Sequence, residues 1–281
     1  MSNPEPRIPN PGRIAFIGGG NMARSLIGAL IRGGADAQRI RIAEPDAALR
    51  STLARDFGVS THERNADAAR DAETIVLAVK PQVMREVCAE LGAAIASGRP
   101  LIVSIAAGIR IDQIAAWIGK DWPIVRSMPN TPALIGAGAT GLIASTRTSI
   151  AERARAEALL ASAGRTAWIA REELMDAVTA VSGSGPAYFF LLVEALENAA
   201  IAQGLPHETA RMLATQTCLG AGLMLTESGE APATLRERVT SPGGTTAAAL
   251  AAFEEGGLRE LVATAVAAAT ERGRELSARG N

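Results

Sequence analysis

The stretch RIAFIGGGNMARSLIGALIRGG, at residues 13–34, constrains the fold of this chain more than any other feature. An apolar run typical of a buried strand passes directly into Gly18-Gly19-Gly20 and then into a segment with helical periodicity. In that context the pattern G-x-G-x-x-A is typical of a turn that binds the pyrophosphate of a dinucleotide at a helix N-terminus. Gly18 permits the tight turn, Gly20 lets the backbone approach phosphate, and Ala23 lets the helix pack closely on the strand. A glycine-rich turn without a ligand is the alternative, which the flanking strand and helix disfavour.

The N-terminal half continues as an alternation of short apolar runs and helical stretches. We predict strands over 13–18, 39–43, 74–79, 101–106, 123–128, 140–145 and 166–170, and helices over 21–33, 46–56, 82–97, 110–119 and 149–163. This alternation predicts an α/β fold with a doubly wound, Rossmann-like parallel sheet covered by helices on both faces. After Glu172 every segment has helical periodicity. The sequence therefore predicts a disordered, proline-rich tail at 1–12, then a dinucleotide-binding domain at 13–170, and then an all-helical domain at 171–281.

The helical half carries more apolar surface than one chain can bury. The segments 187–203 and 209–226 are apolar on more than one face, and Gly220 and Gly222 permit close backbone approach. A domain built this way buries its excess apolar surface against a second copy. We therefore expect the helical domain to form the interface of a homodimer.

Composition excludes several classes of function. The formal net charge of −1 leaves no electrostatic footprint for nucleic acid or an anionic membrane. The longest apolar run, AYFFLLV, is too short to span a bilayer, and the first dozen residues lack the apolar core of a signal peptide. We therefore expect a cytoplasmic protein with no nucleic-acid and no membrane partner. Its two cysteines and two histidines lie far apart, without the paired spacing of a metal site, so no metal is expected.

Residues at the carboxyl ends of the predicted strands form the candidate cofactor site, because ligands of open α/β sheets bind at that edge. Glu44 follows the second strand, where an acid can accept hydrogen bonds from both adenosine ribose hydroxyls and repel a 2′-phosphate. A solvated loop glutamate is the alternative. The segments at Ala78–Pro81 and Ser104–Ala106 follow two further strands, and their small residues leave room for a nicotinamide. Tight packing explains these small residues equally well.

The stretch SPGGTT, at residues 241–246, breaks the helical half and offers two hydroxyls where the next helix begins. A helix N-terminus attracts anions, and the hydroxyls of Thr245 and Thr246 can both donate and accept hydrogen bonds. The alternative is that one of these threonines only caps the helix.

The distribution of proton donors narrows the chemistry. Reduction of a ketone needs a proton donor, usually lysine or histidine. The chain has two lysines, Lys80 and Lys120, both in the first predicted domain, and the one histidine of the helical part, His207, falls in a predicted loop. An imine can arrive already protonated and needs no such donor. The sequence therefore favours an imine substrate with an anionic group over a hydroxy acid.

The chain resembles the pyrroline-5-carboxylate reductase family over nearly all of its length after the proline-rich tail. The matching pieces, in order, are FIGGGNMA, AVKP, VSIAAG, MPNTPALIGAG, DAVTAVSGSGPAYFF and SPGGTTAAAL. The resemblance implies reduction of 1-pyrroline-5-carboxylate to L-proline with NADPH or NADH (NADP or NAD as the cofactor). It also implies an N-terminal Rossmann domain and a C-terminal helical domain that forms an interlocked dimer, often assembled into a decamer of five dimers.

The resemblance also assigns residues. It implies that the substrate binds Glu172, Ser241, Gly243, Gly244, Thr245 and Thr246, with Thr246 as the catalytic residue that hydrogen-bonds the ring nitrogen. For the cofactor it implies Gly18, Gly19, Gly20, Asn21, Met22, Asn65, Ala78, Val79, Lys80, Pro81, Ser104, Ile105 and Ala106. The chain departs from the family at Glu44-Pro45-Asp46, where members commonly have Ser-Pro-Asp or an arginine, which weakens the implied contact with a 2′-phosphate. Arg238, beside the SPGGTT turn, is a second departure, and the sequence does not explain it.

Two other functions compete with this reading. A β-hydroxyacid dehydrogenase shares the two-domain plan, but the absence of lysine from the helical part argues against it. A dinucleotide sensor without catalysis, whose helical half binds a partner protein, is compatible with the Rossmann half. A small carboxylate bound at the SPGGTT turn would exclude it.

Overall fold

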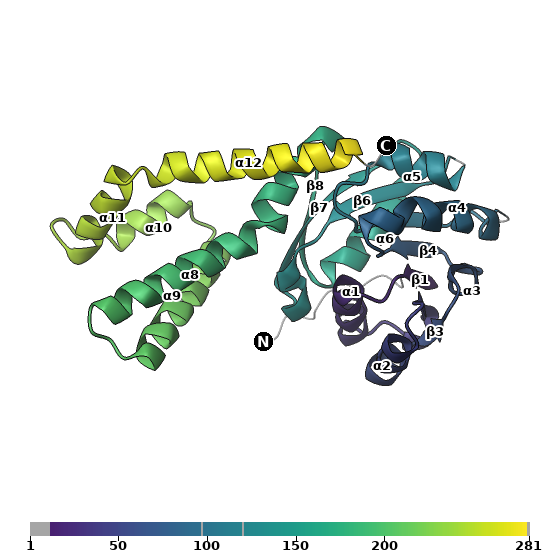
Figure 1. Cartoon of the computed structure of the whole chain (residues 1–281), viewed down its shortest axis with the longest axis horizontal. Coiled ribbons are helices and arrows are strands. Elements are labelled where there is room, and N and C mark those ends of the chain that lie inside the picture. The colour runs from purple at the N-terminus through teal and green to yellow at the C-terminus, as the bar shows by residue number, and fades with distance from the viewer. Residues whose placement is uncertain (1–11, 97, 120, 280–281) are drawn as a thin grey trace. The chain divides into compact units, whose positions relative to one another are not determined.

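The computed structural model describes residues 12–96, 98–119 and 121–279. Contacts divide the chain into two compact units (Figure 1). The first runs to Gly183 and takes up the chain again from Ala269, and the second is Ser184–Ala268. The division by contacts thus falls later than residue 170 and returns the end of the last helix to the first unit. The disordered tail expected at 1–12 lies, except for Gly12, outside the described residues.

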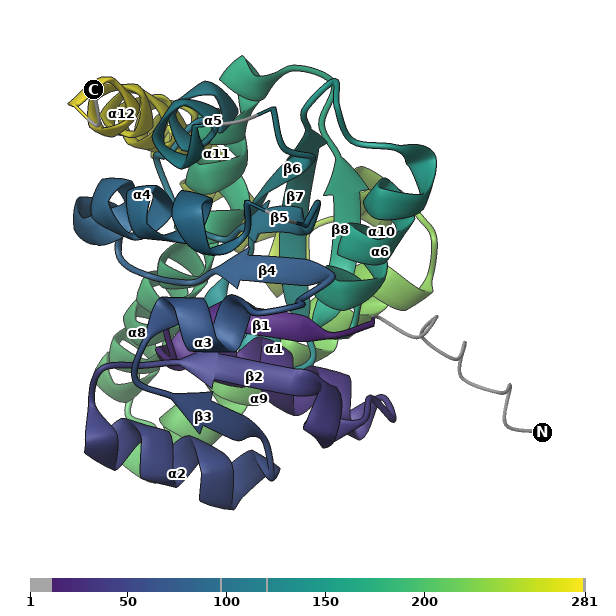
Figure 2. The same cartoon turned by 90° about the vertical axis from the view of Figure 1, so that its right-hand side faces the viewer.

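One sheet organises the first unit. Its eight strands lie in the order β3-β2-β1-β4-β5-β6-β7-β8 (Figure 2). The strands are β1 Ile14–Ile17, β2 Ile40–Ala43, β3 Ser60–His62, β4 Thr74–Leu77, β5 Leu101–Ser104, β6 Ile124–Met128, β7 Gly138–Ala144 and β8 Gly164–Trp168. The chain adds β2 and β3 on one side of β1 and continues from β4 on the other. The order therefore reverses between β1 and β4, and such a switch point is where doubly wound sheets bind ligands.

Two features of the sheet differ from the sequence prediction. The short strand β3 was not predicted, because its three residues, Ser60 to His62, are polar and only partly buried. β7 runs antiparallel to β6, whereas a parallel sheet was predicted. Residues 129–137 join these two strands and contain only the 3-10 helix Thr131–Ile135. A parallel connection needs a longer crossover, usually with a helix, so the chain turns back on itself.

Helices cover both faces of the sheet, as predicted. Buried side chains of α1 (Asn21–Arg32), α2 (Ala47–Phe57) and α6 (Ile150–Ala161) pack on one face. Those of α3 (Asn65–Ala69), α4 (Met84–Ala94) and α5 (Ile111–Ile118) pack on the other. All four residues of β1 are buried, because the central strand of such a sheet is covered on both sides.

The rest of the chain is helical, and no strand follows Trp168 among the described residues. The 3-10 helix Glu172–Leu174, α7 (Met175–Val178) and a π-helical turn at Thr179–Gly183 complete the first unit's main segment. They are followed by α8 (Gly185–Ala202), α9 (His207–Glu227), α10 (Pro232–Arg238), α11 (Thr245–Glu255) and α12 (Leu258–Arg279). Within the second unit α8 and α9 pack side by side (Figure 1). The predicted all-helical character of this region is confirmed.

The helix α8 presents large apolar side chains that this chain does not cover. Phe189, Phe190 and Leu191 are 59%, 69% and 66% exposed. By length and composition alone, the helical stretch Glu172–Ala202 also meets the criteria for a bilayer-crossing helix, although the run AYFFLLV within it is short. Only 11% of the most apolar 18-residue segment within this stretch is buried by the described part of the chain. An exposed apolar surface of this kind needs a partner surface.

Candidate active site

The glycine-rich turn joins β1 to α1 at the switch point of the sheet. Gly18 has a φ of +99°, and a Cβ atom there would lie 2.8 Å from the carbonyl oxygen of Ala78. The Gly18 N–H donates to Ala43 O at 2.8 Å, so the turn is fastened to the end of β2. Both the backbone conformation and the close approach require glycine at this position. The predicted role of Gly18 in making the turn is therefore supported by its geometry.

The N-terminus of α1 has the properties of an anion site. A Cβ atom at Gly20 would meet nothing within 4 Å, so the backbone is open to a ligand there. Among the described residues no side chain caps this helix, and its first turn holds no acidic residue. The first N–H groups of the helix are therefore available to donate hydrogen bonds to a phosphate. These residues fit the pyrophosphate of a dinucleotide.

Glu44 is fixed against the same turn. Its Oε2 atom accepts the Gly19 N–H at 2.9 Å, and its Oε1 atom accepts the Asp46 N–H at 3.1 Å. The Glu44 N–H donates to the carbonyl oxygen of His62, the last residue of β3, at 2.9 Å. These contacts argue against a freely solvated loop glutamate. They hold the carboxylate beside the second glycine of the turn.

The ends of β4 and β5 line the same edge of the sheet. Ala78 N–H donates to Ile17 O at 2.8 Å, and Ile105 N–H donates to Leu77 O at 3.2 Å. Ser104 is fully buried, and its carbonyl oxygen accepts the Ser127 hydroxyl at 2.8 Å. The structure therefore brings the segments at Ala78 and Ser104 to the edge that holds the glycine turn.

The other predicted cofactor residues differ in their surroundings. Asn21, Lys80 and Pro81 are exposed, whereas Met22 and Val79 are partly buried. Asn65 begins α3, and its Nδ2 atom donates to Glu90 Oε2 on α4 at 2.7 Å. Its side-chain amide is therefore engaged within the protein, and its contact with the adenosine end stays a prediction.

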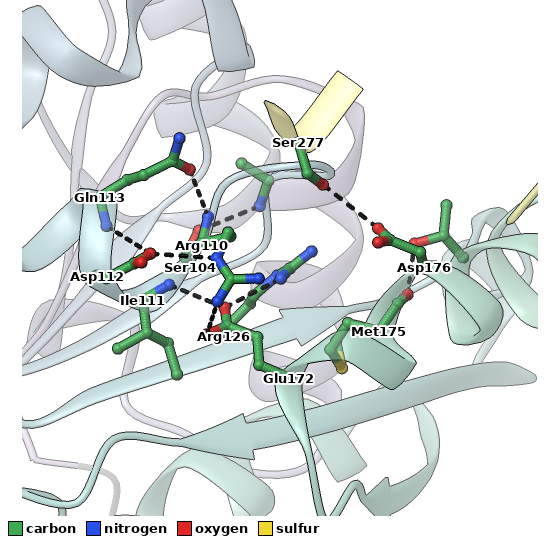
Figure 3. A network of polar contacts seen from close by, with 12 residues as sticks. Ser104, Arg110, Ile111, Asp112, Gln113, Arg126, Glu172, Met175, Asp176 and Ser277 are labelled. Carbon is green, nitrogen blue, oxygen red and sulfur yellow. Dashed lines mark hydrogen bonds and ion pairs between the residues drawn. The ribbon is translucent and has the colours of Figure 1, made fainter. Parts of the chain in front are cut away.

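Glu172 is part of a polar network inside the first unit (Figure 3). Its Oε1 atom accepts hydrogen bonds from Arg126 Nη1 at 3.0 Å and from the Ile111 N–H at 2.9 Å. Arg110 Nη2 lies 3.9 Å from the Oε2 atom. The side chains of Arg126 and Glu172 are only 4% and 14% exposed, so the two charges compensate each other in a buried setting. This engagement gives Glu172 a structural role, and its predicted contact with the substrate stays a prediction.

Arg126 was missed by the sequence reasoning. It lies on β6 opposite Ser104 of β5, in a stretch predicted only as a strand. The signal was present, because an arginine within an apolar strand is rarely buried without a partner. A search for acids that could pair with it would have included Glu172.

The turn from Ser241 to Thr246 belongs to the second unit. Gly243 has a φ of +70°, and the Gly244 N–H donates to Ser241 O at 3.0 Å. Gly244 is the N-cap of α11, and no side chain caps this helix. Thr245 and Thr246 are therefore its first two residues, and within the described part of the chain neither hydroxyl has a hydrogen-bond partner. The alternative that these threonines only cap the helix is not supported.

Arg238, which the sequence did not explain, forms an ion pair with Glu230. Its Nη1 atom lies 2.6 Å from Glu230 Oε1. The contact joins the end of α10 to the loop that precedes it. Arg238 therefore has a local structural partner.

Two family descriptions match the chain. The pyrroline-5-carboxylate reductase dimerisation family matches residues 172–276, and the NADP oxidoreductase, coenzyme F420-dependent, family matches residues 13–108. A pyrroline-5-carboxylate reductase of Pseudomonas aeruginosa is 50% identical over 265 residues, which cover 94% of this chain and 97% of the relative. The chain belongs to the pyrroline-5-carboxylate reductase family.

Solved structures agree with this membership. The pyrroline-5-carboxylate reductase of Coxiella burnetii matches with a TM-score of 0.92 at 42% identity, covering 95% of this chain and 99% of that one. The Plasmodium falciparum enzyme, solved with NADP bound, matches with a TM-score of 0.83 at 28% identity over 95% and 99% of the two chains. The predicted family, the Rossmann-like fold with its helical dimerisation region and the NAD(P) cofactor class are confirmed. The chain is an oxidoreductase of this family.

Proposed function

We propose that this chain reduces 1-pyrroline-5-carboxylate to L-proline with NADPH or NADH, the last step of proline biosynthesis. The observation that carries the proposal is the start of α11, where an uncapped helix N-terminus and two unpaired threonine hydroxyls coincide. Close relatives over nearly the full length are named pyrroline-5-carboxylate reductases, which supports it. When bound, the dihydronicotinamide supplies the hydride that reduces the imine carbon.

In this proposal the turn at 241–246 binds the substrate. The backbone and hydroxyls of Ser241, Gly243, Gly244, Thr245 and Thr246 hold the carboxylate, as the partial positive charge of a helix N-terminus favours. Thr246 hydrogen-bonds the ring nitrogen, which arrives protonated, so no lysine is required on this side. Glu172 keeps its proposed place near the substrate. The hydrogen bonds that it accepts from Arg126 Nη1 and the Ile111 N–H hold its carboxylate in position.

The proposed cofactor residues lie along one edge of the first unit. The turn Gly18–Met22 binds the pyrophosphate, and Glu44 with Asn65 binds the adenosine end. The segments Ala78–Pro81 and Ser104–Ala106 bind the nicotinamide half. The domain division that belongs to this proposal is a cofactor domain at 13–170 and a substrate and dimerisation domain at 171–281.

We further propose that the working form is a homodimer, assembled into a decamer, in the cytoplasm and without nucleic-acid or membrane partners. The exposed apolar residues of α8 support the dimer. Leu191→Asp should raise the dissociation constant of the dimer about 100-fold or more, because a buried unpaired charge costs several kcal/mol. Ile150→Asp is the matched control, since Ile150 is 88% exposed at the first position of α6 in the other unit. Light scattering over a range of concentrations checks both, and a wild type that is monomeric and active contradicts the dimer.

Following the oxidation of NADH and of NADPH, with and without 1-pyrroline-5-carboxylate, tests the reaction. We expect oxidation only when the imine is present, with proline as the product. Gly18→Val is the control, because its side chain would meet the Ala78 carbonyl and distort the cofactor turn. A chain that binds either cofactor but never turns over the imine is instead the dinucleotide sensor.

A further inference from the structure

The position of Glu44 bears on which nicotinamide cofactor this chain prefers. Both oxygens of its carboxylate accept backbone N–H groups, from Gly19 at 2.9 Å and from Asp46 at 3.1 Å. Its backbone is also fixed, because Arg50 Nη1 donates to the carbonyl oxygens of Glu44 and Pro45 at 2.7 and 2.8 Å. The carboxylate is held by two hydrogen bonds and its backbone by Arg50, so it cannot leave its place without breaking both N–H contacts. It stays beside the glycine turn, at the end of the strand where doubly wound folds hold the adenosine ribose.

The arginines around this carboxylate are mostly engaged elsewhere. Arg24 Nη2 lies 2.8 Å from Asp56 Oδ2, and its guanidinium is placed over the ring of Phe57. Arg50 donates to the two carbonyls and lies 3.8 Å from Glu63. A phosphate dianion beside Glu44 would therefore meet a fixed negative charge, and these two cations are already paired. The ribose hydroxyls of NADH would instead meet the Glu44 carboxylate as a strong hydrogen-bond acceptor.

Arg64, close to the end of β3, forms no ion pair or side-chain hydrogen bond with the residues that the structure describes. Arg64 is exposed and follows β3 by two residues. The end of β3 is adjacent to Glu44, since the Glu44 N–H donates to His62 O. In the inference below, Arg64 is the cation that offers a charge to a 2′-phosphate.

We propose that Glu44 sets the cofactor preference of this chain toward NADH, by accepting hydrogen bonds from the adenosine ribose hydroxyls and repelling the 2′-phosphate of NADPH. The inference rests on the proposed function only in taking the Gly18–Met22 turn as the cofactor site. It makes Glu44 a specificity-determining residue. Arg64 supports whatever NADPH binding remains.

Binding of NADH and NADPH to the purified full-length chain tests this inference without the imine. We follow the fluorescence of the bound dihydronicotinamide to obtain a dissociation constant for each cofactor. In the wild type we expect NADH to bind about ten times more tightly, or more, which is the contribution of hydrogen bonds to a charged acceptor. In Glu44→Ser, NADH should weaken and NADPH should tighten, so that the ratio changes by about 10- to 100-fold. Glu44→Gln keeps an acceptor for the Gly19 N–H and should shift the ratio in the same direction.

Asp46→Ser is the matched control. Asp46 caps α2 by accepting the N–H groups of Ala48 and Leu49, and serine caps helices equally well. The variant removes one negative charge only two residues from Glu44, so it separates a general field from direct contact. We expect its cofactor ratio to equal that of the wild type. Arg64→Ala should weaken NADPH alone.

Three outcomes overturn the inference. They are a wild type that binds NADPH at least as tightly as NADH, a ratio unchanged in both Glu44 variants, and an equal change in Asp46→Ser. Failure of the proposed reaction is a different result. A chain that shows the expected cofactor ratios but never reduces the imine keeps this inference and loses the proposed function.

Discussion

The N-termini of α6 and α11 are in opposite states, the first closed by a serine cap and the second headed by glycine. At α6, Ser149 Oγ accepts the Glu152 N–H at 3.3 Å, and the Glu152 carboxylate returns to the Ser149 N–H at 2.7 Å. Arg99 lies 2.7 Å from the same carboxylate. At α11, Gly244 stands at the cap position, no side chain caps the helix, and no acid lies in its first turn.

In the proposed function, this difference separates a helix start that stabilises the fold from one that binds the substrate. A closed capping box satisfies the free N–H groups of a helix and contributes to folding. An open N-terminus leaves those groups and the partial positive charge of the helix for a ligand. At α11 the cap position is glycine, which has no side chain to close the helix. The proposed binding of the substrate carboxylate uses the N–H groups that this leaves free.

Closing the N-terminus of α11 should have the largest effect. Gly244→Asp would let a carboxylate cap α11, as Asp46 caps α2 in this chain. A negative charge about 4 Å from the substrate carboxylate costs about 4 kcal/mol at an intermediate dielectric, so kcat/KM for the imine should fall roughly 100- to 1000-fold. Stability should change by only a few tenths of a kcal/mol, since glycine is already a tolerable cap. Steady-state kinetics and thermal unfolding check the two halves of this expectation.

Gly244→Ser is the control for the added side chain. A Cβ atom at this position would lie 3.1 Å from Ser241 O, so both variants share the same small crowding. Serine can also cap the helix but adds no charge, so its loss of activity should be much smaller than that of Gly244→Asp. Equal losses in the serine and aspartate variants would mean that capping or crowding, and not the negative charge, disables the turn.

Removal of a single hydroxyl should have the next largest effect. Thr246→Ala removes the group proposed to bond the ring nitrogen, which is worth about 1.5–3 kcal/mol when one partner is charged. We expect kcat/KM for the imine to fall about 10- to 100-fold, with cofactor binding unchanged. Thr245→Ala is the neighbouring control, and it should affect the carboxylate contact with a smaller loss. An unaltered kcat/KM in Thr246→Ala would leave this threonine without a catalytic role.

The sequence predicted what depends on local pattern. The strand, glycine turn and helix around Gly18 were recognised because all three elements are contiguous. The open state of α11 was not predictable, since glycine and the threonines are all acceptable near a cap position. Whether a hydroxyl turns back to its own helix is decided by the folded geometry.

Contacts between distant segments were also beyond reach. Glu44 and Gly19 are joined by a hydrogen bond across two strands, and Arg126 and Glu172 pair across the sheet edge. Each pair needs the topology before it can be proposed. The direction of β7 likewise depended on a connection that lacks a helix. Sequence therefore located the candidate cofactor and substrate segments, and the structure was needed to show which side chains are already engaged.

Opening the N-terminus of α6 should affect stability alone. Ser149→Ala removes the hydroxyl that accepts the Glu152 N–H and donates to its carboxylate. Loss of such a cap typically costs about 1 kcal/mol. The melting temperature should fall by about 2–4 °C, while kcat/KM for the imine stays at the wild-type value. A loss of activity comparable to that of Thr246→Ala would break the distinction between the two helix starts.

The smallest expected effect is the pH dependence of the α6 cap. Partial burial acts to raise the pKa of Glu152, but the hydrogen bonds from Ser149 and the charge of Arg99 outweigh it, so the pKa lies below its ordinary value of 4.5. A carboxyl whose pKa is lowered by folding contributes stability above its unfolded pKa, and that contribution is lost as pH falls through the folded pKa. Glu152→Gln keeps the capping geometry but removes the charge, so at pH 7 it should lower the free energy of unfolding by up to about 1 kcal/mol.

That difference should shrink as the pH falls below about 4.5, because protonation leaves the wild type with a neutral side chain as well. Urea unfolding of both proteins at several pH values from 7 downward measures it. Carboxyls elsewhere lower the stability of both proteins equally in acid, so only the difference between them reports on this cap. A gap that stays constant with pH would show that the negative charge of Glu152 does not stabilise α6, and that the box acts through its neutral hydrogen bonds alone.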